Sequence, residues 1–394
     1  MQNHELILEI PYGTRDFLPS EAAEKRAIEA ALAGLFTRWG YEEVVTPTIE
    51  YLDTLTMGNG SALEPHMFKF FDKNNRTLAL RHEMTTPIAR VVASRLQDAV
   101  MPLKLSYISS VFRYEQTQTG RQCEFYQAGV ELIGSSSAAS DAEVIALAVE
   151  GMKKAGLKDF QVCLGQVEFI NGIMQQVRLS AEQQEQIKSA MEKHDLVGLE
   201  AVVDDTELSK NAKDILKKLP LLHGKEDLLK KAYDIALNEQ SRRALDNLFE
   251  IYHLLEAYGA AEYVSFDLGV IRDFNYYTGM VFEAYTPGLG FPLCGGGRYD
   301  HMLSDFGTAC PATGFALGIE RILLALERQG LQKPRIEKDL YVAYESGKIK
   351  EAIAQVNELR VQGKVAELAL QAQSKEEAVR YQQDKGYSRL IYLA

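Results

Sequence analysis

The stretch Val111-Phe-Arg-Tyr-Glu115, followed by Gly120-Arg121 and Phe125-Tyr-Gln127, decides the fold of this chain. Arg113 and Glu115 are two apart, so they share one face of a predicted strand. A guanidinium at a strand end can donate two parallel hydrogen bonds, which suits a carboxylate or a phosphate. The alternative for Arg113 is a structural ion pair in the core. The glycine-containing loop and the second aromatic run favour a binding role.

A second piece lies much further along the chain, at Thr313-Gly-Phe-Ala-Leu-Gly-Ile-Glu-Arg321. We predict a glycine-rich strand that runs directly into a helix carrying Glu320 and Arg321. The two pieces together resemble motifs 2 and 3 of the class II aminoacyl-tRNA synthetases. This resemblance implies an α+β fold, in which an antiparallel sheet of six or seven strands is flanked by helices.

Composition limits the possible functions. The chain has 394 residues, with 43 Lys and Arg against 55 Asp and Glu, and a net charge of −12. This balance argues against a large surface for nucleic acid, so tRNA is not an expected partner. The sequence lacks a signal-peptide pattern and an apolar run long enough to span a membrane, so we expect no membrane partner. The cysteines show no metal-binding spacing, so we expect no metal, no cofactor, and free thiols in a reducing cytoplasm: Cys123, Cys163, Cys294 and Cys310.

The residue pattern divides the chain into two predicted domains. Residues 1–328 form the class II-like domain, into which a charged, strand-poor helical segment is inserted at about 171–258. Its first helix runs from about Ser20 to Arg38, and the strand that follows ends at Pro47. Residues 339–394 show the order strand, helix, strand, helix, strand, which predicts a small α/β domain with a parallel sheet.

Local patterns predict several further elements. A hairpin is expected around Asn74-Asn75, followed by a helix from about Met84 to Ser94. Three Ser-x-x-Glu/Gln patterns predict capping boxes at helix starts, beginning at Ser140, Ser180 and Ser374.

Candidate site residues flank the motif 2-like stretch. Glu83 can accept an ammonium group, and Thr85 can donate and accept beside it. The alternative for Glu83 is an exposed glutamate at a strand end. Gln127 and Glu131 are four apart, so in an extended segment they point into the same cleft.

A further group of candidates lies in Ile271-Arg-Asp-Phe-Asn-Tyr-Tyr-Thr-Gly279. Tyr276 and Tyr277 offer flat faces with polar tips, which suit an imidazole or a base, although one of the two is expected to serve the core. Arg272 can hold a carboxylate. The run Gly295-Gly-Gly-Arg-Tyr-Asp300 allows the backbone to approach a ligand, or makes a tight turn.

The order of these segments resembles histidyl-tRNA synthetase specifically, over about residues 10–327, and implies a homodimer. The resemblance assigns the ligand's ammonium to Glu83, Thr85 and Gln127, and its imidazole to Glu131 with Tyr277. It places Arg272, with Arg113 nearby, at the carboxylate, and Tyr276 in the same recognition loop. Glu115, Arg121 and Arg321 are implied to be inherited from the ancestral nucleotide site.

The chain departs from that enzyme at Met84, where the family has a glycine, and at Asn275, where it has an aspartate. The motif 2 loop lacks its usual basic residues, and the C-terminal domain is shorter than an anticodon-binding domain. These departures resemble the paralogous regulatory subunits of ATP phosphoribosyltransferase. That resemblance implies a non-catalytic subunit with no catalytic residues of its own. Such a subunit would form a hetero-oligomer with a short-form catalytic subunit and serve the first step of histidine biosynthesis. Its implied effector is L-histidine.

Two alternatives follow from the same residues. A histidyl-tRNA synthetase with a truncated anticodon-binding domain would explain why Arg113, Arg272 and Arg321 are retained. A synthetase-like module that binds another partner is the third interpretation.

Overall fold

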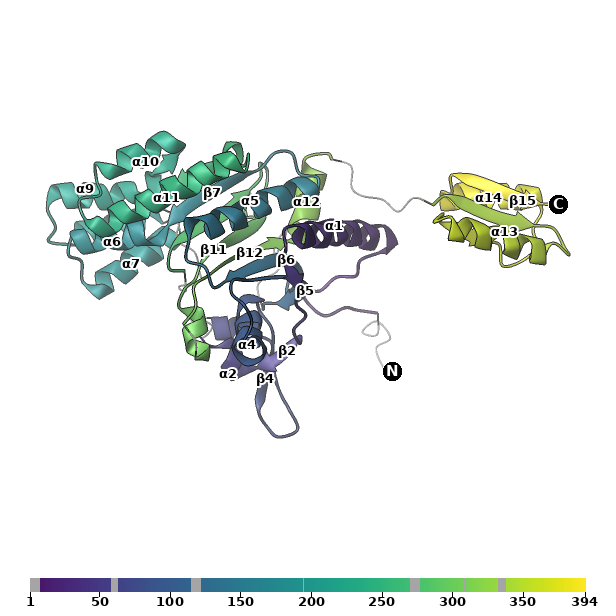
Figure 1. Cartoon of the computed structure of the whole chain (residues 1–394), viewed down its shortest axis with the longest axis horizontal. Coiled ribbons are helices and arrows are strands. Elements are labelled where there is room, and N and C mark those ends of the chain that lie inside the picture. The colour runs from purple at the N-terminus through teal and green to yellow at the C-terminus, as the bar shows by residue number, and fades with distance from the viewer. Residues whose placement is uncertain are drawn as a thin grey trace. The chain divides into compact units, whose positions relative to one another are not determined.

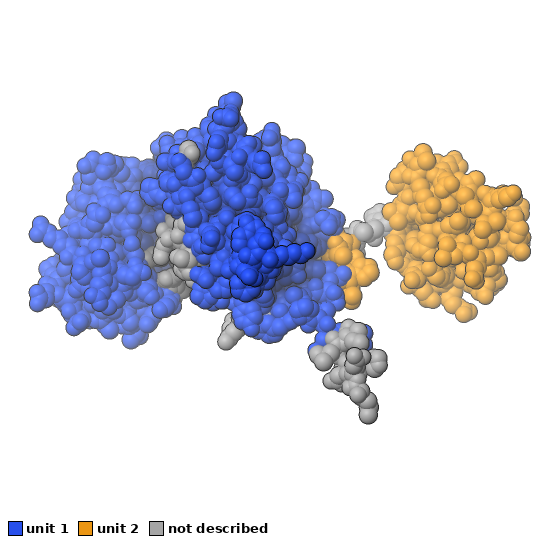
Figure 2. All heavy atoms as spheres, turned by 90° about the horizontal axis from the view of Figure 1, so that it is seen from below, with its two compact units in different colours: residues 1–17, 25–333 blue, residues 18–24, 334–394 orange. Residues whose placement is uncertain are grey.

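The computed structural model describes residues 8–57, 63–114, 122–193, 195–269, 277–307, 309–331 and 338–394. Residues 1–17 with 25–333 form one compact unit, and residues 18–24 with 334–394 form the other. Figure 2 colours the two units separately.

The first unit is built on a nine-stranded sheet with the order β1-β5-β6-β12-β11-β10-β7-β9-β8. Six neighbouring strands, from β5 to β7 in that order, pair antiparallel, which confirms the predicted fold class. The pairs β1–β5 and β7–β9 are parallel, so the sheet is wider and more mixed than predicted. Its strands are β1 (Glu42–Glu43), β5 (Leu103–Phe112), β6 (Glu124–Ile133), β7 (Gln161–Gln166), β8 (His223–Gly224), β9 (Val264–Asp267), β10 (Met280–Tyr285), β11 (Cys294–Arg298) and β12 (Ala312–Gly318).

One face of this sheet is covered by helices. The helix α5 (Ala138–Lys154) contacts β6, β11 and β12, while α12 (Ile319–Arg328) contacts β6 and β12. The helix α11 (Glu239–Ala257) packs on α5 and β7, as Figure 1 shows. The large apolar core lies between these layers and includes residues of α1 (Pro19–Arg38). Burial of this face against helices leaves the other face available for a ligand.

A second, smaller core covers part of the opposite face, over β5 and β6. It contains α4 (Thr85–Arg95) and the short helix η5 (Met302–Phe306). A three-stranded antiparallel sheet lies beside α4 and has the order β2-β4-β3, from Ile49–Tyr51, Thr77–Leu80 and Lys69–Phe71. Asn75 adopts a positive φ of 59° in the turn between β3 and β4, as the predicted hairpin requires. The short helices α2 (Leu52–Leu55) and η2 (Glu64–His66) complete this region.

The segment between β7 and β9 is almost entirely helical. It contains α6 (Val167–Gln176), α7 (Ala181–Glu192), α8 (Leu196–Asp204), α9 (Lys210–Lys218), η3 (Leu219–Leu221), α10 (Glu226–Tyr233) and α11. The two-residue strand β8 joins it to the sheet beside β9, and η4 (Ala261–Tyr263) leads back into β9.

Two of the three predicted capping boxes are confirmed, at Ser180 and at Ser374. The third is wrong, because α5 begins three residues earlier and is capped by Ser137, whose hydroxyl accepts from the backbone N–H of Ser140. The carboxylate of Glu143 is engaged instead by Lys104 and by the Tyr41 hydroxyl. The strand predicted to end at Pro47 is also shorter than expected, since only Glu42 and Glu43 pair as β1.

The second unit has a three-stranded parallel sheet with the order β14-β13-β15, which confirms the predicted βαβαβ arrangement. Its elements are β13 (Leu340–Tyr344), α13 (Ile349–Val361), β14 (Ala366–Leu368), α14 (Lys375–Lys385) and β15 (Arg389–Leu393). Every residue of the central strand β13 is buried, as expected for a strand with helices on both faces. Tyr341 packs against Tyr381 of α14, with ring centroids 4.6 Å apart.

Candidate functional site

The register of the sheet brings the predicted site residues to its second face. Glu131 of β6 lies opposite Gly314 of β12, and Gln127 lies opposite Gly318. On the other side of β6, Gln127 pairs with Ser109. Because side chains alternate along a strand, Gln127 and Glu131 point to the same face, away from the helices α5 and α11.

Glu131 is the most deeply buried acidic group on this face, with 2% of its surface exposed. Its Oε1 accepts a hydrogen bond from the Thr85 hydroxyl at 3.0 Å, and its Oε2 accepts one from the Tyr299 hydroxyl. Burial raises the pKa of Glu131 to about 8, against the opposing effect of these two hydrogen bonds, and the nearby charge of Glu83 raises it further. Glu131 is therefore protonated at neutral pH, before any cation or N–H donor of a ligand reaches it.

Glu83 and Thr85 lie at the start of α4. The Glu83 carboxylate accepts hydrogen bonds from the backbone N–H groups of Thr85 and Thr86, at 2.6 and 2.8 Å. The side chain is 6% exposed, so it is not the exposed strand-end glutamate of the alternative interpretation. It holds the first turn of α4 and, through Thr85, is linked to Glu131. The two carboxyl groups thus belong to one hydrogen-bonded cluster.

Arg113 directly follows β5, at the predicted strand end. Its Nε donates to the backbone oxygen of His82 at 2.9 Å, and its guanidinium carbon lies 5.5 Å from the centre of the Phe125 ring. His82 is itself buried, and burial lowers its pKa to about 4, so the imidazole is neutral. The backbone carbonyl of His82 therefore helps to hold Arg113 in place.

Gln127 and Arg321 extend the same face towards α12. Gln127 is half-buried, and its amide forms no hydrogen bond with another described residue. Arg321 packs over Gly318, where an added Cβ would lie 3.1 Å from Cδ of the arginine. Its Nη1 donates to the backbone oxygen of Pro292 at 2.6 Å. Gln127 and Arg321 are thus both close to Gly318.

Three glycines allow the side chains of this face to pack directly against the sheet. A Cβ at Gly314 would lie 2.0 Å from Oε2 of Glu131, and a Cβ at Gly129 would lie 2.4 Å from the Tyr107 hydroxyl. A Cβ at Gly297 would lie 2.7 Å from the ring of Tyr277, so Tyr277 lies directly against β11. Larger side chains at these positions would displace Glu131, Tyr107 and Tyr277.

Sequence reasoning missed Tyr107 and Tyr299. Both are buried aromatic residues with hydroxyls on the cleft face, and Tyr299 bonds Glu131 directly. Tyr299 lies within the glycine-rich run Gly295–Asp300. Because side chains alternate along a strand, Tyr299 shares a face with Gly295 and Gly297, and this alternation could have indicated its position. Tyr107 carried no such signal, because its place opposite Gly129 depends on the register of β5 with β6.

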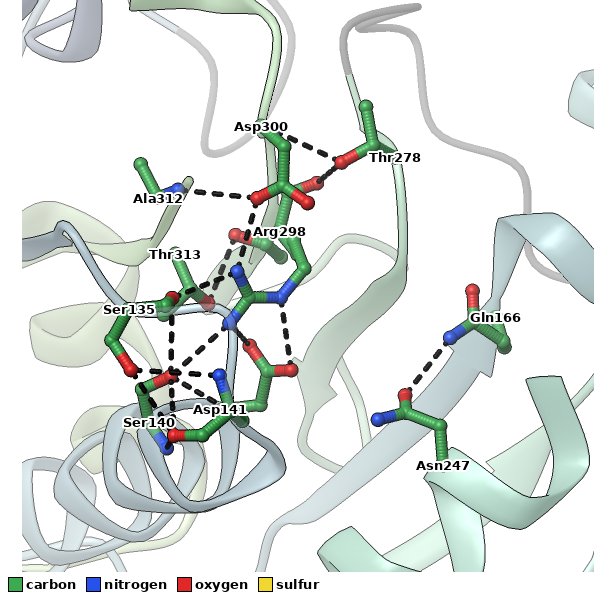
Figure 3. Close-up of polar contacts among 12 residues, drawn as sticks. Ser135, Ser140, Asp141, Gln166, Asn247, Thr278, Arg298, Asp300, Ala312 and Thr313 are labelled. Carbon is green, nitrogen blue, oxygen red and sulfur yellow. Dashed lines mark hydrogen bonds and ion pairs between the residues drawn. The ribbon is translucent and has the colours of Figure 1, made fainter. Parts of the chain in front are cut away.

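Arg298, the other large residue of that run, has a structural role on the opposite face. Its guanidinium bonds both oxygens of Asp141 at 2.8 and 3.1 Å and Oδ1 of Asp300 at 3.0 Å, as Figure 3 shows. It also donates to Ser140 and to the backbone oxygen of Ser135. This network joins the start of α5 to β11, on the helix-covered face of the sheet, opposite the face that carries Glu131.

Met84 does not point into the cleft as its place beside Glu83 suggested. Its side chain is 1% exposed and packs in the second core with Ile88 and Val92. A longer side chain at this position therefore fills the core under α4 rather than the ligand space.

Four of the predicted residues lie outside the described residues: Glu115, Arg121, Arg272 and Tyr276. Within the described ranges, the protein contains no cluster of His, Cys, Asp or Glu suited to a metal ion. No helix in that part of the chain is long and apolar enough to cross a membrane.

This face gathers groups that can hydrogen-bond a small polar ligand. They are the carboxyl groups of Glu83 and Glu131, the Gln127 amide and the hydroxyls of Tyr107 and Tyr299, with Arg113 at the end of β5. Carboxylates and amides suit an ammonium group and ring N–H donors.

Comparison with known proteins defines the family. The family model for histidyl-tRNA synthetase matches residues 13–322. An ATP phosphoribosyltransferase regulatory subunit of Moorella thermoacetica is 48% identical, over 81% of this chain and 82% of its own length. One from Desulfitobacterium hafniense is 38% identical over 99% of both chains. The chain belongs to the histidyl-tRNA synthetase family and, within it, to the regulatory subunits of ATP phosphoribosyltransferase. The resemblance stated from the sequence is thereby confirmed.

Solved structures agree with this family. A crystal structure from Bacillus halodurans, described as an ATP phosphoribosyltransferase regulatory subunit/histidyl-tRNA synthetase, superposes with a TM-score of 0.88 at 34% identity, covering 98% of this chain and 99% of its own. The histidyl-tRNA synthetase of Nostoc sp. PCC 7120 superposes with a TM-score of 0.86 at 20% identity, which shows a shared fold alone. Regulatory subunits of this family thus keep the synthetase fold.

Proposed function

We propose that this chain is a non-catalytic regulatory subunit of ATP phosphoribosyltransferase. It associates with a short-form catalytic subunit and conveys feedback by histidine on the first step of histidine biosynthesis. The observation that carries the proposal is the identity of 38% over 99% of both chains with a protein of that name. The four free cysteines are consistent with work in the reducing cytoplasm.

L-histidine is the effector that the cleft fits best. Glu83, Thr85 and Gln127 would receive its ammonium group, and Glu131 with Tyr277 its imidazole. The carboxylate would lie towards Arg113, with Arg272 and Tyr276 completing the recognition loop. Support comes from the buried carboxyl pair linked through Thr85, and from the Gln127 amide that is unbonded within the described chain.

Glu115, Arg121 and Arg321 correspond to nucleotide-site residues of a synthetase, and in this proposal they no longer bind a nucleotide. Arg321 is occupied by the backbone oxygen of Pro292, and Glu115 and Arg121 complete that set. Charging of tRNA is not part of the proposed function, and no cofactor is required.

A homodimer is part of the proposal. β1 lies at the edge of the nine-stranded sheet, and large apolar side chains next to β1 and β5 are exposed. Val45 is 80% exposed and Val100 is 89% exposed. Burial of such side chains against a second copy of the chain would remove apolar surface from water.

The decisive experiment combines the purified chain with the short-form catalytic subunit from the same genome. Light scattering should detect a hetero-oligomer, and phosphoribosyl transfer should become sensitive to histidine only when both proteins are present. Absence of association at micromolar concentrations would overturn the proposed partnership. Association without histidine sensitivity would support the proposed partner and contradict the proposal that histidine is the effector.

A further inference from the structure

A second cavity lies on the helical side of the sheet, away from the cleft described above. It has a volume of about 320 Å³ and is formed where α1, α5 and α11 end near one another. Its lining consists of Trp39, Ala146, Val149, Glu150, Lys153, Lys154, Tyr258, Gly259 and Ala260. None of these residues belongs to the proposed histidine site.

The floor and the rim of this cavity come from one stripe of α5. Positions 146, 149, 150, 153 and 154 share a face, because residues three and four apart are neighbours on a helix. Ala146 and Val149 are buried, while Lys153 and Lys154 are exposed. The stripe therefore gives an apolar floor with a cationic rim.

The wall is aromatic and held in place by the backbone. The rings of Trp39 and Tyr258 stack with centroids 5.7 Å apart and planes inclined by 23°. Gly259 has a positive φ of 69°, and its N–H donates to the backbone oxygen of Glu256. This turn sets Tyr258 at the end of α11 without closing the cavity, since a Cβ at Gly259 would meet no atom within 4 Å.

Two of the charged side chains at the rim form no salt bridge within the described part of the protein. Lys154 and Glu150 form no salt bridge with another described residue, whereas the Lys153 ammonium lies 5.1 Å from the centre of the Tyr263 ring. Two lysines and one glutamate make the rim cationic on a chain whose net charge is −12. Lys154 is thus the cationic group of the rim that an anion would pair with, against the partial negative charge at the C-terminal ends of α1, α5 and α11.

We infer that this cavity binds a small planar heteroaromatic molecule that carries an anionic group. The ring would lie on the Trp39–Tyr258 wall over Ala146 and Val149, and its phosphate or carboxylate would meet Lys154. The volume of this cavity is that of usual small-molecule sites, and its lining, which is more polar than apolar, suits a ring that carries a charged group. A single phosphate or carboxylate contact supplies orientation, and the aromatic wall supplies most of the contact area.

Trp39 makes the inference directly testable, because it is the only tryptophan in the chain. Its fluorescence, excited at the red edge of its absorption, should change saturably with AMP and with nicotinate, which combine a ring with an anion. Adenosine and inorganic phosphate, each with one half of that chemistry, should bind at least tenfold more weakly. Lys154→Ala and Tyr258→Ala should each weaken binding of AMP and nicotinate at least tenfold.

A matched control separates binding from helix-end electrostatics. Lys154 is the last residue of α5, and Lys218 is the exposed last residue of α9. Lys218→Ala should leave the titration unchanged. Binding of only AMP or only nicotinate would assign the anion as phosphate or as carboxylate, respectively. Absence of saturable change with both compounds, or equal affinity in wild type and Lys154→Ala, would mean that the lysines only complement the α5 dipole and would overturn the inference.

Discussion

The hydroxyl of Thr85 donates a hydrogen bond to Oε1 of Glu131 across 3.0 Å, which joins the first turn of α4 to the middle of β6. Thr85 and Glu131 are far apart in sequence, and each was a candidate on separate grounds. Through this contact Glu131 is linked to Glu83, whose carboxylate accepts from the backbone N–H groups of Thr85 and Thr86 at the start of α4. If histidine binds at Glu131 as proposed, its binding would bear on the start of α4.

Substitution of Glu83 by glutamine should weaken histidine binding. The change keeps the shape of the side chain and one acceptor oxygen, but it removes the negative charge proposed to pair with the ammonium. A charge-assisted hydrogen bond contributes about 1.5–3 kcal/mol, so affinity should fall roughly ten- to a hundredfold. Calorimetric titration measures this loss, with Glu42→Gln on the exposed strand β1 as control. Equal affinity of wild type and Glu83→Gln would place the effector elsewhere.

Glu131 should make stability depend on pH. In the unfolded chain a glutamate has a pKa of about 4.3, whereas the carboxyl of Glu131 in the native state has a pKa of about 8. Between these values the native state keeps a proton that the unfolded state has lost. The free energy of unfolding should therefore fall as pH rises through this window, by up to about 1.4 kcal/mol per pH unit, and level off above the native pKa.

The variant Glu131→Gln removes this dependence. Urea unfolding of both proteins near pH 5 and near pH 8 should show wild type losing stability relative to the variant at the higher pH. Glu124→Gln on the same strand, which is only half-buried, serves as control. Parallel pH profiles for wild type and Glu131→Gln would contradict a raised pKa.

Removal of Arg298 should destabilise the first unit strongly. Burial outweighs the attraction of Arg298 and holds the pKa of Asp141 above its ordinary value, so this pair is already costly to bury. Arg298→Met leaves Asp141 without its partner and should lower the free energy of unfolding by about 3–5 kcal/mol. The double variant Arg298→Met/Asp141→Leu should recover much of the loss, and Arg38→Met on the surface should cost little. A loss below about 1 kcal/mol in the single variant would show that the network is not a support.

The purified chain should not charge tRNA with histidine. The reasons are the relationship to regulatory subunits, the departures from the enzyme at Met84 and Asn275, and a net charge that opposes a nucleic acid surface. Incorporation of labelled histidine into cognate tRNA is the measurement, with histidyl-tRNA synthetase from the same genome as positive control. Turnover of roughly 1 per second or more would make the chain a working synthetase.

Sequence alone was sufficient where a local pattern decides the structure. The capping boxes at Ser180 and Ser374 and the glycine-rich strand leading into Arg321 were predicted from neighbouring residues and are confirmed. The box at Ser140 failed because a tertiary contact, Lys104 with Glu143, competes for the carboxylate that capping needs. Local patterns carry no record of such long-range competition.

The candidate site was only partly accessible to sequence reasoning. Alternation along β6 placed Gln127 and Glu131 on one face, which the register confirms. Tyr299 and Tyr107 reach the same cleft through strand pairing, and Met84 turns away from it into the core. Strand pairing and helix packing decide these positions, and both depend on residues that are distant in the sequence.

Gly129, Gly297 and Gly314 lie where neighbouring strands leave no volume for a side chain. An added Cβ would lie 2.2, 2.7 and 2.4 Å, respectively, from a backbone oxygen of the adjacent strand. One extra methyl group there would disturb the strand pairing and the placement of Glu131, Tyr107 or Tyr277 at the same time. Relatives that carry alanine at these positions should therefore lack the proposed histidine response, even where the acidic and amide groups of the site are kept.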